Sequence, residues 1–191
     1  MDEDGIKSAF ELAMERISGL PELTPEEIAE QKEKEYAPQG TAIAVKYLDG
    51  VLSADELPAE LKRFSGEPQA IVRRALVSAL CREIQLEKGP DSATRALDGL
   101  AQLAPPQSNL AAEAGKNYFE LLGRFDSAKE KSLREFGNSA SEPMKALGIS
   151  GSAVRPNLNE NELWKQELDR IRQSFEPELD RLVARLAREL T

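Results

Sequence analysis

The sequence predicts an all-α fold: an irregular multi-helix bundle with short loops and a long C-terminal helix that is kinked or interrupted at a proline. Apolar residues recur every three to four positions in most segments, which is the spacing of an amphipathic helix. Proline and glycine gather between those segments, where they end one helix and permit the next. The 191 residues are enough for one domain with its own core, so we expect a single helical domain over 1–191 with roughly six to nine helices.

Two acidic helices are expected over residues 5–36. The apolar stripe of the first helix consists of Ile6, Phe10, Ala13 and Ile17. These positions are spaced i, i+4, i+7 and i+11, so they share one helix face. In the second helix, Thr24 and Glu27 form a capping box around Pro25, which predicts a helix from Pro25 to about Tyr36. That helix has almost no apolar stripe, and we expect it to be exposed on most sides.

The helical core is expected over about residues 41–147, and it begins after a break. Pro38 and Gly40 predict that break, and a short apolar helix follows at 41–48. Ser53 and Glu56 then form another capping-box pattern. A proline two residues later limits any helix there to a turn before a new start.

The centre of the fold is expected over about residues 66–137, with its central helix at residues 69–86. This segment follows Pro68, is the most apolar in the chain, and predicts a central helix that ends at Gly89. The next helix, at 93–103, is closed by two consecutive prolines.

A further helix begins near Ser108, and two readings of its course stay open. It either continues past Gly123 or breaks there. Read as a break, residues 122–128 resemble the inter-helix turn of a tetratricopeptide repeat, but no second copy follows at about 34 residues, so we do not expect a repeat array. A short helix capped near Ser141 and ended by Gly148 should complete the core.

The last part of the chain divides into a connector at 148–158 and a C-terminal helix at 159–191. Pro177 lies inside the apolar pattern of that helix. Because its ring removes one backbone donor, the sequence predicts either a kink or a second helix capped by Ser174. The apolar stripe persists to the end of the chain under both alternatives.

The charge and composition disfavour several classes of partner and cofactor. The net charge is −9, and residues 1–40 hold eleven acidic side chains against four basic ones. No basic stripe is present, so binding to nucleic acid or to an anionic membrane is not expected. The chain has no histidine and one cysteine, Cys81. We therefore expect no cofactor, no cysteine–histidine nucleophile and no metal site of the usual histidine-containing types.

Three short constellations are weak candidates for chemistry. Glu26, Glu30 and Glu33 share a helix face, but the lysines between them favour ordinary surface pairing over a metal site. Cys81 lies mid-helix and is expected to be an inert thiol. The glycine- and serine-rich connector could form an anion-binding nest, although a plain connector explains it as well. The residues of that candidate nest are Gly151, Ser152 and Arg155.

The C-terminal stripe is the strongest binding candidate. Its possible interaction face consists of Trp164, Leu168, Ile171, Phe175, Leu182 and Leu186. Large apolar side chains on one helix face can dock on a partner, but they pack more often on the chain's own core. Three arginines flank the end of this stripe, at positions 181, 185 and 188. They could meet the acidic N-terminal region of a second copy or of a partner.

Two short stretches carry a resemblance. Residues 6–13 (Ile-Lys-Ser-Ala-Phe-Glu-Leu-Ala) and 148–154 (Gly-Ile-Ser-Gly-Ser-Ala-Val) resemble segments of uncharacterised helical bacterial proteins. The resemblance implies an all-helical fold and brings no activity or site residues. The sequence as a whole therefore predicts a cytoplasmic helical interaction or scaffold protein that binds a protein partner or itself. The alternative is a small-ligand-binding protein or an enzyme that uses carboxylate or lysine chemistry.

Overall fold

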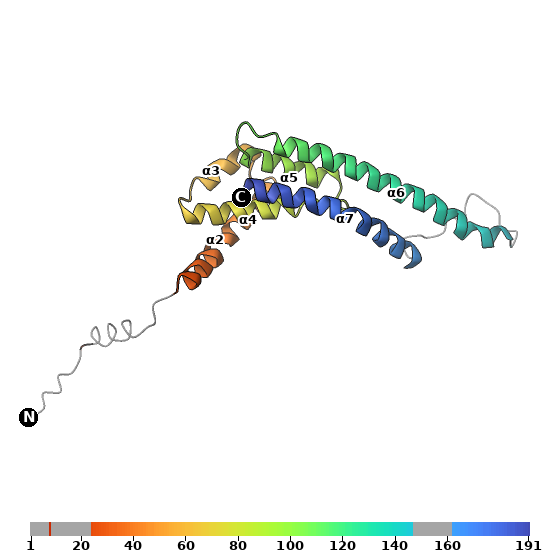
Figure 1. Cartoon of the computed structure of the whole chain (residues 1–191), viewed down its shortest axis with the longest axis horizontal. Coiled ribbons are helices and arrows are strands. Elements are labelled where there is room, and N and C mark those ends of the chain that lie inside the picture. Colours follow the sequence, from red (N-terminus) through yellow and green to blue (C-terminus); the bar gives the residue numbers. More distant parts are fainter. Residues whose placement is uncertain (1–7, 9–23, 147–161) are drawn as a thin grey trace, which may run out of the picture.

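The chain folds as an all-α bundle (Figure 1). The computed structural model describes residue 8 and residues 24–146 and 162–191. Within those residues there are six α-helices, one 3-10 helix and no strand, which confirms the predicted fold class. The elements are α2 (Pro25–Leu48), η1 (Ala54–Glu56), α3 (Leu57–Leu61), α4 (Glu67–Cys81), α5 (Pro90–Leu103), α6 (Leu110–Ala146) and α7 (Glu162–Leu190). The first predicted helix and the connector lie outside the described residues.

Helix α4 is the centre of the bundle, as the sequence predicts, and it packs against α2, α3, α5 and α7. Its buried side chains are all apolar, with Val72, Leu76, Val77 and Leu80 fully enclosed. Helices α6 and α7 lie side by side and extend beyond the other helices at one end of the molecule (Figure 1). The opposite end gathers α3, the start of α4 and the end of α7 (Figure 1).

Helix α2 is a single helix, so the predicted break at Pro38 is wrong. The capping box of Thr24 and Glu27 starts the helix at Pro25 as expected, but the helix then continues through Pro38 to Leu48. Its first half is largely exposed, as predicted. Tertiary packing explains the continuity, because Gly40 lies against α4 so closely that a β-carbon there would come 2.2 Å from the carbonyl oxygen of Val72.

Helix α4 ends at Cys81, eight residues before the predicted end at Gly89. The residues between them form a turn and loop that still bury Ile84 and Leu86. Gly89, with a φ of 84°, then allows the backbone to enter α5. The Ser53–Glu56 capping box is present, and it starts η1 immediately before α3 as the sequence predicts.

Helices α6 and α7 are both continuous, which decides between the alternatives that the sequence left open at Gly123 and Pro177. Gly123 lies inside α6 and does not form a repeat-like turn, and α6 also runs through the short helix expected near Ser141. Helix α7 contains Pro177 internally, so the alternative of a second helix capped by Ser174 is wrong. Pro177 and Gln173 are both exposed, and water can therefore bind the carbonyl that the proline leaves without a donor.

Arg73 connects three helices. Its Nε donates to the carbonyl oxygen of Leu190 at the end of α7, and its Nη2 donates to that of Leu103 at the end of α5, both at 2.7 Å. Carbonyls in the last turn of a helix have no intrahelical partner, so a guanidinium that reaches two such ends satisfies both. Leu186 and Leu190 are buried beside this contact, which fixes the last turns of α7 on the core.

We predict that Gly40→Ala lowers the free energy of unfolding by about 1–3 kcal/mol, because the new methyl group would clash with backbone rather than with a flexible side chain. The matched control is Gly123→Ala, where nothing lies within 4 Å. That change should stabilise the protein by about 0.5–1 kcal/mol through helix propensity. Urea unfolding followed by circular dichroism measures both, and equal effects at the two positions would contradict the close approach of α2 and α4.

We also predict that Arg73→Met lowers the free energy of unfolding by about 2 kcal/mol, since two charge-assisted hydrogen bonds are lost. Hydrogen exchange should accelerate most in the last turns of α5 and α7. Arg74→Met is the control, because Arg74 pairs with Glu33 at the surface and such pairs contribute about 0–1 kcal/mol. Unchanged protection in the last turn of α7 would refute the link.

Candidate functional site

The predicted interaction face of α7 lies mostly inside the molecule. Trp164, Ile171 and Leu186 are buried, and Leu168, Phe175 and Leu182 are half-buried. The ring of Phe175 meets that of Phe125 on α6 edge to face, with centroids 5.7 Å apart. The stripe therefore packs on the chain's own helices in this structure. Partner binding through it stays a prediction, and it would require α7 to leave the core.

The arginines that flank the stripe do not form a positive face. A groove of about 380 Å³ between α6 and α7 contains Arg181 and Arg185, but Arg188 does not line it. Arg185 pairs with Glu189 at 2.9 Å and with Glu113 at 3.5 Å. In the same groove Arg124 holds Glu178 through two hydrogen bonds of 2.8 and 3.0 Å. The groove has mixed charge, and its ion pairs hold α6 and α7 together.

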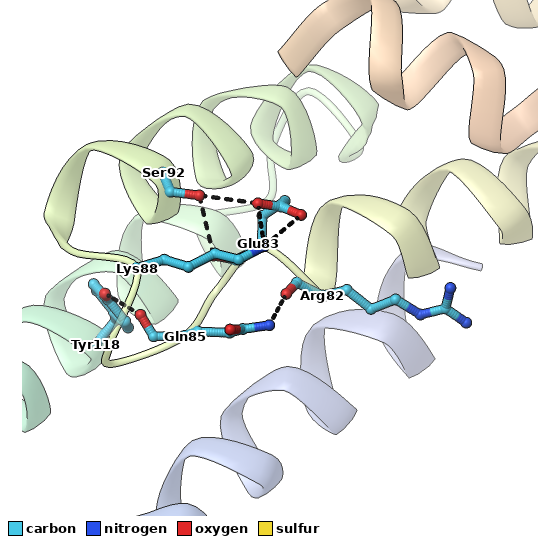
Figure 2. Close-up of polar contacts among 6 residues, drawn as sticks. All are labelled: Arg82, Glu83, Gln85, Lys88, Ser92 and Tyr118. Atoms are coloured by element: carbon cyan, nitrogen blue, oxygen red, sulfur yellow. Dashed lines mark hydrogen bonds and ion pairs between the residues drawn. The ribbon is translucent and has the colours of Figure 1, made fainter. Parts of the chain in front are cut away.

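A second cluster of polar side chains lies around the loop between α4 and α5 (Figure 2). Lys88 Nζ donates to both carboxylate oxygens of Glu83, at 2.9 and 3.0 Å, and the Ser92 hydroxyl donates to one of them at 3.1 Å. The Tyr118 hydroxyl donates to the carbonyl oxygen of Gln85 at 3.0 Å. Arg82 points away from these groups in Figure 2. The cluster fixes the loop, and the groups in its network are engaged with one another.

Cys81 lies at the start of that loop and is buried as a free thiol. Burial raises the pKa of the thiol from its ordinary value of 9.0 to about 11. A nucleophilic cysteine needs the opposite shift, because the thiolate is the reactive form. The environment of Cys81 thus fits the predicted inert thiol.

The two remaining candidates are the three aligned glutamates and the anion nest, and the described residues show no arrangement of groups at either that could bind a ligand. Glu30 pairs with Lys34 at 2.7 Å, and Glu33 pairs with Arg74, so two of the three aligned carboxylates are engaged with cations. No group of three or more histidine, cysteine, aspartate or glutamate side chains in the described part of the chain could hold a metal ion. The candidate anion nest at Gly151, Ser152 and Arg155 lies outside the described residues.

A groove at the end of the bundle where three helices finish is the best candidate for a binding site. It has a volume of about 350 Å³. We call it the basic groove, and its lining residues are Pro58, Leu61, Lys62, Gly66, Gln69, Ala70, Arg73, Gln102, Leu103 and Thr191. This lining has two cationic side chains and no acidic one. Four further grooves each contain at least one carboxylate side chain in their lining. Two of them lie along α7, one lies beside the end of α2, and one lies between α6 and the first turns of α7.

The position of the basic groove at three helix ends explains why cationic side chains line it. Helices α3, α5 and α7 end there, and their terminal carbonyls carry partial negative charge. Gln69 donates to the carbonyl oxygen of Leu61 at 3.1 Å, while Arg73 donates to those of Leu103 and Leu190. Arg73 uses two of its five N–H donors in this way, which leaves three. Lys62 is exposed at the end of α3, and neither cation forms an ion pair with a side chain in the described part of the chain.

No protein-family model, curated protein or solved structure matches this chain. Among the helices of the described residues, none combines the length and the apolar character that a membrane span requires. Sequence reasoning missed the basic groove because its residues come from three helices, the turn between α3 and α4, and the residue after α7. Lys62 and Thr191 are far apart in the sequence, and neither stands in a recognisable motif.

We predict that Cys81 in the folded protein reacts with Ellman's reagent at least about 100-fold more slowly than in denatured protein at pH 8. At that pH, three units below a pKa of about 11, about one thiol in a thousand is ionised. The rate should rise as the pH approaches 11. Free cysteine at the same pH calibrates the reagent, and a comparable rate in the folded protein would show that the thiol is accessible.

Proposed function

We propose that this protein is a helical interaction or scaffold protein that docks an acidic segment of a protein partner in the basic groove. The observation that carries the proposal is the pair of cations, Lys62 and Arg73, in a lining without a carboxylate side chain. Across the rest of the described surface, arginine and lysine side chains are often matched by nearby acids. Lys62 and Arg73 form no ion pair with a side chain in the described part of the chain, and the support for an acidic ligand is the charge that remains after Arg73 has bound two helix-end carbonyls.

The dimensions of the groove favour a peptide over nucleic acid. A volume of about 350 Å³ accepts a few side chains or a small ligand. Pro58, Ala70 and Leu103 supply apolar wall next to the cations, which suits a segment that mixes acidic and apolar residues. Nucleic acids require many phosphate contacts, and the net charge of −9 opposes them.

The titratable groups give no support to the alternative of carboxylate or lysine chemistry. The pKa values of Glu56, Glu83 and Glu178 are all lowered, by hydrogen bonds from the Ser53 backbone, Lys88 and Arg124 respectively. These shifts keep the three carboxylates ionised at neutral pH, whereas a general acid there needs a raised pKa. A cytoplasmic location is part of the proposal, and its support is the single cysteine, a reduced thiol.

The test compares proteins from a native lysate that bind to immobilised full-length protein and to two variants. Lys62→Glu reverses a charge in the basic groove, and Lys116→Glu makes the same change at an exposed position of α6 outside every groove described above. A partner should bind to wild type and to Lys116→Glu and be lost, by about tenfold or more, with Lys62→Glu. Its binding should also weaken from 50 to 300 mM salt. Equal retention by the two variants would reject the groove.

A further inference from the structure

We propose that the groove of about 380 Å³ between α6 and α7, here called the α6–α7 groove, binds a small zwitterion. The class of ligand is a free α-amino acid with an apolar side chain. Its ammonium group would pair with Glu120 of α6, and its carboxylate would pair with Arg181 of α7. The α6–α7 groove and the basic groove share no lining residue, so this inference goes beyond the proposed function.

Two ion pairs join α6 and α7 along this groove. Arg124 of α6 donates two hydrogen bonds to Glu178 of α7, at 2.8 and 3.0 Å, and its guanidinium lies 5.6 Å from the centroid of the Phe175 ring. Arg185 of α7 pairs with Glu113 of α6 at 3.5 Å. In these two pairs the residue number falls on α6 as it rises on α7, so the two helices run antiparallel as well as side by side (Figure 1).

Glu120 and Arg181 lie between those two ion pairs, at nearly the same height on opposite walls of the groove. Glu120 is about 6 Å along α6 from Arg124, and Arg181 is about 4.5 Å along α7 from Glu178 in the same direction, at 1.5 Å per residue. Both side chains are exposed, and neither forms a hydrogen bond or an ion pair in the described part of the chain. A ligand can therefore bind both without breaking an existing ion pair.

The charges and the size of the groove select the class of ligand. Glu120 would repel a simple anion and Arg181 would repel a simple cation, whereas a zwitterion offers a partner to each. The residues that follow them in the sequence, Leu121 and Leu182, line the same groove and supply apolar surface. A volume of about 380 Å³ is near the lower end of the range for small-molecule sites, which suits an amino acid better than a large cofactor.

The test is a titration of the 15N-labelled full-length protein with L-leucine, followed by NMR. Exposed ion pairs contribute little each, so we expect a dissociation constant in roughly the millimolar range, with the largest shifts at the amides of Leu121 and Leu182. Two derivatives remove one charge of the ligand at a time. L-Leucinamide lacks the carboxylate and N-acetyl-L-leucine lacks the ammonium group, and each should bind about fivefold more weakly than leucine.

Two variants assign each charge of the ligand to one wall of the groove. Arg181→Met should weaken leucine binding about fivefold and make leucinamide bind no more weakly than leucine, because the partner of the carboxylate is gone. Glu120→Gln should abolish the difference between leucine and N-acetyl-leucine in the same way. The matched control is Lys131→Met, which removes an exposed cation of α6 outside the groove and should leave leucine binding unchanged. Thermal melting of each variant checks that it folds as wild type does.

Three results would overturn the proposal. The first is the absence of saturable shifts at these amides up to about 50 mM leucine. The second is an unchanged preference for leucine over both derivatives in Arg181→Met and Glu120→Gln. The third is self-association of wild type that both variants abolish, without leucine binding, which would assign the groove to a second copy. Lys62→Glu should leave leucine binding unchanged, so this test and that of the basic groove succeed or fail separately.

Discussion

The fold depends on how a short central helix binds the ends of its neighbours. Helix α4 has 15 residues, yet α2, α3, α5 and α7 all pack against it. Burial of apolar side chains holds the sides of these helices together, but it supplies no hydrogen-bond donor to the carbonyl groups in their last turns. Arg73 does so for α5 and α7 at once, across separations of 30 and 117 residues in the sequence. That one side chain of α4 therefore joins the last turns of two helices that lie far apart in the sequence.

The same arrangement explains why the basic groove exists. Helices α3, α5 and α7 all contribute their last residues or the residue that follows to this end of the bundle, and a hollow remains between them. Cations there offset the partial negative charge of the helix ends. A structural need accounts for two of the five Arg73 donors, and Lys62 and Arg73 both line the groove. The fold and the proposed site thus share a physical cause.

Local signals in the sequence predicted helix starts well and helix breaks poorly. The capping boxes at Thr24 and Ser53 are present where expected, because a cap depends on residues within one turn. Pro38 was expected to interrupt a helix and lies inside α2, while Gly123 and Pro177, where a continuous helix was one of two alternatives, lie inside α6 and α7. A proline costs a helix about 3 kcal/mol, a penalty that packing on both sides can exceed. The basic groove was beyond sequence reasoning for a related reason, since tertiary contacts alone bring its residues together.

The continuity of α2 also fixes the direction of its exposed first half. A break at Pro38 would have left residues 25–36 without a fixed direction relative to the core. Two contacts prevent this: Gly40 packs against Val72 on α4, and Lys32 pairs with Glu67. Both lie on one rigid helix, so the direction of α2 is set at two points along its length. The exposed first half of α2 is consequently held in one direction relative to the core, although it buries almost none of its own side chains.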